Sequence, residues 1–212
     1  MNHSPSVHLI PALRGRPQAE ALISGSENFP NITGWVRFYQ TNEGVVVYAE
    51  VSGLPVSDQP CQERVFGFHI HQGTDCGGSG DEPFPHAMSH YDPKECEHPY
   101  HAGDLPPLFG NKGLAVCAVL TDRFLVEDVI GKVVIIHDHP DDFTTQLSGN
   151  SGTKIACGVI QRTARFCAGT PTPMVLAGKA SADSVNAPWA GLGLWTFSGR
   201  LSSCVWMLFP AA

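Results

Sequence analysis

The stretch from Phe68 to Asp104 places the tightest limit on how this chain can fold, because it holds six of the ten histidines. It opens with F-H-I-H and runs on through H-Y-D-P and E-H-P-Y-H-A-G-D. Side chains alternate between the two faces of an extended strand, so His69 and His71 project together while Ile70 points the other way. The fold must therefore present two imidazoles on one side of a strand that continues into a histidine-rich loop.

Short strands are predicted for the rest of the chain between residues 19 and 160. The runs there are rich in β-branched and aromatic residues and are bounded by Gly, Pro or Asn, as antiparallel strands are. The 22 glycines and 17 prolines among 212 residues also favour many turns over long helices. We expect about eight strands, at residues 19–24, 33–40, 44–53, 65–71, 113–120, 124–130, 132–137 and 154–160.

Two long connections interrupt this pattern, at residues 72–112 and 138–153. A loop of such length inside a compact domain is usually functional. The predicted fold class is therefore all-β, an antiparallel barrel or immunoglobulin-like sandwich with two long functional loops.

One main domain is expected. Residues 1–18 carry prolines and charges without a period, which predicts a loosely ordered lead-in to a domain at 19–160. Residues 161–212 contain no Glu, one Asp and three of the four tryptophans. We treat 161–212 as a C-terminal extension to which the sequence assigns no role.

Charge and hydropathy exclude several classes of partner. A net charge of −7 without a Lys/Arg-rich run argues against nucleic acid. No run reaches the ~20 apolar residues that span a membrane, and the first twenty residues lack the apolar core of a secretory signal. We therefore expect a cytoplasmic chain, although seven cysteines are many for a reducing compartment and leave export possible. The odd number leaves at least one thiol unpaired.

A zinc site is predicted in the first loop. Three imidazoles and one carboxylate lie within fifteen residues and match the closed four-coordinate shell of structural Zn²⁺: His90, His98, His101 and Asp104.

A second metal group is predicted where two strands end, from His69, His71 and His137. A nitrogen-rich site without thiolate favours Cu(II), and His90 is the nearest candidate for a fourth nitrogen. The chain shows no nucleotide loop or nucleophile motif that would point to a different chemistry.

Several motifs then occur in a specific order: H-I-H at 69–71, H-Y-D-P at 90–93, H-A-G-D-L at 101–105, V-I-I-H at 134–137, D-D at 141–142 and G-N-S-G-T-K-I-A-C-G-V-I at 149–160. On these motifs residues 19–160 resemble the copper,zinc superoxide dismutase family, and the short loops resemble its bacterial members. The resemblance implies an eight-stranded Greek-key barrel.

The resemblance also implies one copper (Cu) and one zinc (Zn) ion per chain. Copper would be bound by His69, His71, His90 and His137. Zinc would be bound by His90, His98, His101 and Asp104, so that His90 bridges the two metals. Asp141 would hydrogen-bond one ligand of each metal, namely His69 and His98. Cys76 and Cys157 would form an intrachain disulfide.

The implied reaction converts superoxide to O₂ and H₂O₂ by cycling Cu(II)/Cu(I), with His90 also supplying a proton. Lys154 stands where the family usually has an arginine beside copper; it keeps the cation but lacks the planar fork of a guanidinium. His139 is either a second cation for steering superoxide or a solvated loop residue. The implied partners are the substrate superoxide and an unidentified copper-loading protein. The resemblance also allows a homodimer with a second copy of the chain.

Two alternative functions stay open, and in a third alternative the domain is degenerate and the unusual tail after residue 160 marks a truncated or read-through product. The same barrel could serve as a non-catalytic copper/zinc-binding module. A mononuclear zinc hydrolase is disfavoured, because the zinc set is already closed and no paired general base is evident. Cys96 could pair with Cys61 or bind metal, Cys117 is expected to be a core residue, and the partners of Cys167 and Cys204 are not assigned.

Overall fold

A computed structural model describes residues 9–59, 64–78 and 82–164. Those up to Thr163 belong to one compact unit. Its helices and strands are α1 (Leu9–Arg14), β1 (Ala19–Gly25), β2 (Thr33–Thr41), β3 (Gly44–Ser52), β4 (Val65–Phe66), β5 (Phe68–His71), the 3₁₀ turn η1 (Pro85–Ala87), β6 (Leu108–Phe109), β7 (Ala115–Thr121), α2 (Val126–Val129), β8 (Val133–His137) and β9 (Lys154–Arg162). Of the extension predicted at 161–212, residues 165–212 lie outside the described residues.

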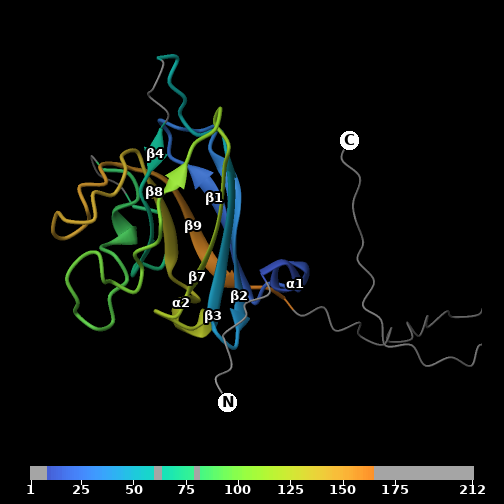
Figure 1. Ribbon diagram of the computed structural model, residues 1–212. Helices are drawn as coiled ribbons and strands as arrows, with labels where there is room; N and C mark the ends of the chain where they lie inside the picture. The colour runs from blue at the N-terminus through green and yellow to red at the C-terminus, as the bar shows by residue number, and fades with distance from the viewer. Residues whose placement is uncertain (1–8, 60–63, 79–81, 165–212) are drawn as a thin grey trace, which may run out of the picture. The chain divides into compact units, whose positions relative to one another are not determined.

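The main sheet has seven antiparallel strands in the order β5-β8-β9-β1-β2-β3-β7, and β4 and β6 form a separate pair. Strands β8 and β9 come late in the chain but lie between β5 and β1, so the connections cross over as in a Greek key. Figure 1 shows the sheet curling, with both long loops gathered on the side away from α1. The all-β class and Greek-key barrel expected from the sequence are confirmed.

Strand alternation explains how the sheet builds a core on one face and a site on the other. On β5, Phe68 and Ile70 point into the barrel core, where they join residues of β8 such as Ile136. The opposite face carries His69 and His71. That face is also buried, because the long loops cover it.

A smaller apolar cluster seals the outer face beside the histidines. Val133 and Ile135 on β8 pack there with Ala87 of the first loop and Cys157 of β9. Because both faces of β5 and β8 are covered, histidines placed on them are withdrawn from water.

The prediction of a strand at 124–130 was wrong, because residues 126–129 form helix α2. The two buried residues of this helix, Val126 and Val129, are three apart, which is a helical spacing. The Asp128 carboxylate accepts a hydrogen bond from the Leu125 backbone N–H at 2.8 Å and thereby satisfies a free donor where the helix begins. Local capping therefore outweighs the β propensity of the apolar residues.

Two smaller differences concern the strand expected at 65–71 and the N-terminal lead-in. The single strand expected at 65–71 divides at Gly67, whose backbone bonds to His139 and His137 instead of continuing one ladder. A Cβ on Gly67 would lie 2.9 Å from the Ser151 side chain, so only glycine allows this approach of the two segments. Within the lead-in expected to be loosely ordered, residues 9–14 form α1.

Candidate metal centre

The first group of histidines lies where β5 and β8 run side by side. His69 and His71 come from the outer face of β5, His137 ends β8, and the first loop brings His90 opposite His71 through an isolated β-bridge. One ligand nitrogen from each of the four residues lies within 4.8 Å of the others. The structure thus brings together all four residues predicted to bind copper.

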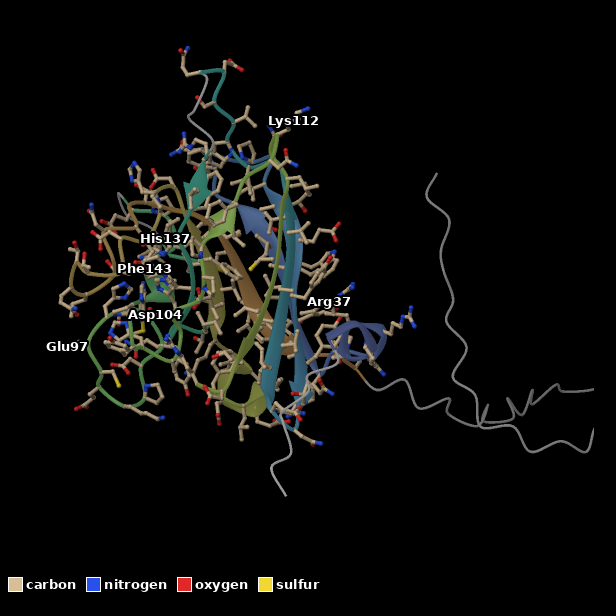
Figure 2. All side chains as sticks on the ribbon, viewed as in Figure 1. Arg37, Glu97, Asp104, Lys112, His137 and Phe143 are labelled. Carbon is tan, nitrogen blue, oxygen red and sulfur yellow. A yellow bond between two sulfur atoms is a disulfide. The ribbon has the colours of Figure 1, made fainter. Side chains whose placement is uncertain are left out.

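The second group lies in the first loop and shares His90 with the first. Its members are His90, His98, His101 and Asp104, again with ligand atoms within 4.8 Å of one another. The Asp104 carboxylate lies 2.7 Å from His90 Nδ1, 3.2 Å from His98 Nδ1 and 3.4 Å from His101 Nδ1. Figure 2 shows Asp104 and His137 on the loop side of the barrel, opposite Arg37.

All seven side chains of the two groups are buried, with Asp104 the most exposed at 8%. Four of their ring nitrogens have no hydrogen-bond partner among the described residues: His69 Nδ1, His90 Nε2, His98 Nδ1 and His101 Nδ1. A buried polar atom without a partner is costly, and a bound metal removes that cost. Four nitrogens in one group suit copper, and three nitrogens with a carboxylate in the other suit zinc. The donor sets therefore fit both metals.

Burial keeps three histidines of the first group, His69, His71 and His137, neutral at physiological pH. Loss of hydration lowers the pKa of His69 to about 4 and the pKa of His137 to about 3, and it holds the pKa of His71 well below its ordinary value. A neutral imidazole has a free lone pair for a metal. Burial opposes ionisation of Asp104, but its hydrogen bond to His90 and the nearby histidine charges outweigh burial and lower the pKa of the carboxyl.

Asp141 of the second loop connects the two groups. Its Oδ2 lies 2.7 Å from His69 Nε2, and its Oδ1 lies 2.9 Å from His98 Nε2 and accepts the Phe143 N–H at 2.7 Å. Burial opposes ionisation, yet these bonds lower the pKa of Asp141 to about 2. Because the carboxylate accepts from each Nε2–H, each Nδ1 stays free to bind a metal.

Gly149 makes room for this carboxylate. Its φ is +63°, and a Cβ there would lie 2.0 Å from Asp141 Oδ1 and 2.7 Å from His98 Nε2. Only glycine both adopts this positive φ readily and leaves the space beside Asp141 and His98 free of a side chain.

Backbone carbonyls orient the remaining two rings. His71 Nδ1 lies 2.8 Å from the Met88 carbonyl, and His137 Nδ1 lies 3.2 Å from the Gly152 carbonyl. Each ring therefore donates from Nδ1 and leaves Nε2 free, and the two Nε2 atoms face each other at 3.3 Å. Two lone pairs directed at one point are a suitable arrangement for a shared metal ion.

Two residues that hold the first loop were not found by sequence reasoning. The Gln146 amide pairs with the backbone of His98, accepting its N–H at 2.9 Å and donating to its carbonyl at 2.8 Å. Arg123, in the turn between β7 and α2, donates to carbonyls of the same loop. Both act on backbone atoms, which leave no pattern in the sequence of side chains.

The remaining predicted residues lie around this centre. Lys154 begins β9 and pairs with His137 in the β8–β9 ladder. His139 is exposed and its Nδ1 lies 3.2 Å from the Asp138 carboxylate. The predicted disulfide between Cys76 and Cys157 is present, with an Sγ–Sγ distance of 2.04 Å, and ties the first loop to β9.

The other cysteines are in two classes. Cys96 and Cys117 are free, and neither belongs to a metal group among the described residues. Cys117 is partly exposed and packs against the main core. Cys61, Cys167 and Cys204 lie outside the described parts of the chain.

Comparison with known proteins agrees with the fold. A family model described as copper/zinc superoxide dismutase (SODC) matches residues 32–160. A superoxide dismutase [Cu-Zn] from Legionella pneumophila is 36% identical over 140 residues, covering 62% of this chain and 80% of the relative. One from Photobacterium leiognathi is 34% identical over 143 residues, covering 60% of this chain and 78% of the relative.

A different kind of relative is also found. A copper chaperone for superoxide dismutase from Sus scrofa is 32% identical over 158 residues, covering 69% of this chain. The match spans about half of that relative, 53% of its length. Separately, none of the helices in the described parts of the chain has the length and hydropathy needed to cross a bilayer.

Proposed function

The chain belongs to the copper/zinc superoxide dismutase family, and from this premise we propose that it converts superoxide to O₂ and H₂O₂. In this proposal one copper is held by His69, His71, His90 and His137, and one zinc by His90, His98, His101 and Asp104. Bound copper supplies one-electron redox chemistry by alternating between Cu(II) and Cu(I), whereas zinc is redox-inactive and orders the loop.

The position of His90 is the observation that carries the proposal. This single ring belongs to both ligand groups, with Nδ1 2.7 Å from Asp104 and Nε2 without a partner on the other side. His90 would therefore contribute to holding both metals, one through each side of its ring. We propose that His90 Nε2 also takes up a proton when it is not coordinated and delivers it to the product.

Lys154 is proposed to bring the substrate to this centre. Superoxide is an anion, and the chain as a whole carries a net charge of −7, so attraction must be local. Lys154 pairs with His137 at the start of β9 and is half-buried there. Its ammonium provides the charge without the two-pronged geometry of arginine, so we expect attraction of superoxide with looser orientation.

The assembly and delivery of metal are further parts of the proposal. Relatives named copper chaperones share this domain, which supports a separate copper-loading partner for this chain. A homodimer and a cytoplasmic location stay predictions, and the Cys76–Cys157 disulfide favours a compartment where disulfides persist.

A second candidate function is a non-catalytic copper-binding domain. The similarity to copper chaperones favours it, as does a lysine at the position where the family usually has an arginine. The two candidates share the fold and differ in whether superoxide is consumed.

One experiment separates these candidates. The full chain is reconstituted with copper and zinc, its metal content is measured by elemental analysis, and its consumption of superoxide is followed. The dismutase proposal requires one copper and one zinc per chain together with rapid superoxide consumption. Full occupancy of both metals without activity would support the non-catalytic candidate, and zinc binding without copper would reject both.

A further inference from the structure

Three backbone carbonyls of the first loop converge on one arginine. Arg123 Nη1 lies 3.1 Å from the Pro99 oxygen, 3.1 Å from the His101 oxygen and 3.2 Å from the Asp104 oxygen. Two of these carbonyls belong to residues of the zinc group itself. One cationic nitrogen therefore contacts the backbone at both ends of the segment 99–104.

Physical chemistry explains why this cation matters. Carbonyl oxygens are the negative ends of their dipoles, so three of them pointing at one place repel each other unless a positive group lies between them. A guanidinium is always charged and presents fixed N–H donors, and hydrogen bonds to a charged donor are stronger than neutral ones. Arg123 forms no ion pair with a carboxylate in the described parts of the chain, so its charge serves these carbonyls.

The segment that carries Arg123 is fixed to the barrel. It follows β7 directly, the next residue, Phe124, is buried, and helix α2 begins at Val126. The loop segment 99–104 has no regular secondary structure apart from turns and an isolated bridge at Asp104. Gly103 already joins this segment to Ile70 and Tyr91 through backbone hydrogen bonds, and Arg123 adds a tie to the backbone on either side of Gly103.

We propose that Arg123 is a positioning residue for zinc: it holds residues 99–104 in the zinc-binding conformation before the metal arrives. The proposal rests on the assignment of His98, His101 and Asp104 to zinc in the proposed function. It adds that part of the zinc affinity resides in a side chain that never touches the metal.

The contacts also predict selectivity between the two metals. His101 and Asp104 belong to the zinc group only. Three of the four proposed copper ligands lie on β5 and β8, whereas the described side-chain hydrogen bonds of Arg123 go to Pro99, His101 and Asp104. Loss of Arg123 should therefore weaken zinc binding and leave copper binding nearly unchanged.

The test compares Arg123→Met and Arg123→Lys with the unmodified chain. Zinc and copper dissociation constants are measured separately on the metal-free full chain by competition with chromophoric chelators. We expect zinc binding to weaken about tenfold or more in Arg123→Met, as for other residues that support metal ligands. Arg123→Lys should recover part of the loss because it keeps a cation with three donors. Copper binding should stay within about twofold in both variants.

Arg162→Met is the matched control, because Arg162 is also an exposed arginine beside α2, but it pairs with Glu127 and contacts neither metal group. It should bind zinc like the unmodified chain. Hydrogen exchange of the metal-free protein adds a readout that needs no metal, and amides of residues 99–104 should exchange faster only in the Arg123 variants. If Arg123→Met does not fold, Arg123→Gln replaces it with the same expectation.

Three results would overturn the proposal: zinc binding of Arg123→Met within about threefold of the unmodified chain, equal losses for zinc and copper, or a lysine variant no better than the methionine variant. Superoxide consumption of the unmodified chain is measured in parallel. If the unmodified chain consumes superoxide but its zinc affinity does not depend on Arg123, the role of Arg123 is rejected and the proposed dismutase function stands. If the chain is inactive but its zinc affinity depends on Arg123, the dismutase function is rejected and the role of Arg123 stands.

Discussion

Replacing Asp141 with asparagine should weaken copper binding more than zinc binding. The carboxylate uses both oxygens as acceptors, Oδ2 for His69 and Oδ1 for His98 and the Phe143 N–H. An amide has only one oxygen. That oxygen should take the Oδ1 position, because two donors meet there, and the NH₂ group must then face His69 Nε2.

A donor facing another donor forces a change in His69. Its ring must move the proton to Nδ1 so that Nε2 can accept from the amide, but Nδ1 is the nitrogen that lacks a protein partner and faces the copper group. The alternative is to leave the Nε2–H buried and unpaired. Removal of such a supporting partner typically costs 10–100-fold in metal affinity, which corresponds to about 1.4–2.8 kcal/mol. We expect a loss of this size for copper and a loss below about threefold for zinc.

Competition titrations of the metal-free Asp141→Asn protein with Cu(II) and with Zn²⁺ measure both affinities. Asp142→Asn is the matched control, because it removes the same charge from the adjacent residue. Among the described residues, the Asp142 carboxylate bonds only to Thr144 and Thr145. A zinc loss equal to or larger than the copper loss would refute the assignment of the two oxygens. Unchanged affinity for both metals would refute the role of Asp141 altogether.

Three further outcomes are expected. Cys76→Ser/Cys157→Ser should lower the unfolding free energy of the metal-free chain by about 4.5 kcal/mol in the chain-entropy model, since the cysteines are 81 residues apart; urea titration measures this, and a loss below about 1 kcal/mol would contradict it. Lys154→Ala should slow superoxide consumption about tenfold and flatten its dependence on ionic strength; stopped-flow kinetics that match the unmodified chain at every salt concentration would remove Lys154 from the site. Removal of zinc by a chelator should speed hydrogen exchange in residues 90–104 and leave β2 and β3 protected; uniform exchange throughout the barrel would show that zinc stabilises the whole fold instead.

The grouping of the histidines with Asp104 was predictable because histidine and aspartate are chemically specific and strands have a strict period of two. His69 and His71 follow from that period alone, and their partners lie within one loop or at the end of one later strand. The two groups that the structure assembles are the ones predicted from spacing. The prediction succeeded where chemistry and local geometry point in the same direction.

Two kinds of feature could not be predicted from the sequence. Helix α2 was mistaken for a strand because the five apolar residues in F-L-V-E-D-V-I suggest β structure. The cap from Asp128 depends on a conformation that the helix itself creates. Arg123 and Gln146 bind backbone atoms of residues about 20 and 48 positions away. A backbone carbonyl is present in every residue, so such contacts become visible only in three dimensions.

The register between β5 and β8 gives the centre a bearing on how the chain folds. His69 lies opposite Ile135 and His71 opposite Val133. A slip of one residue would move one strand's side chains to the other face relative to its neighbour, separating His69 and His71 from His137. Chains paired out of register then cannot assemble the first histidine group. Copper bound as proposed would therefore stabilise the native register of β5 and β8 over shifted registers.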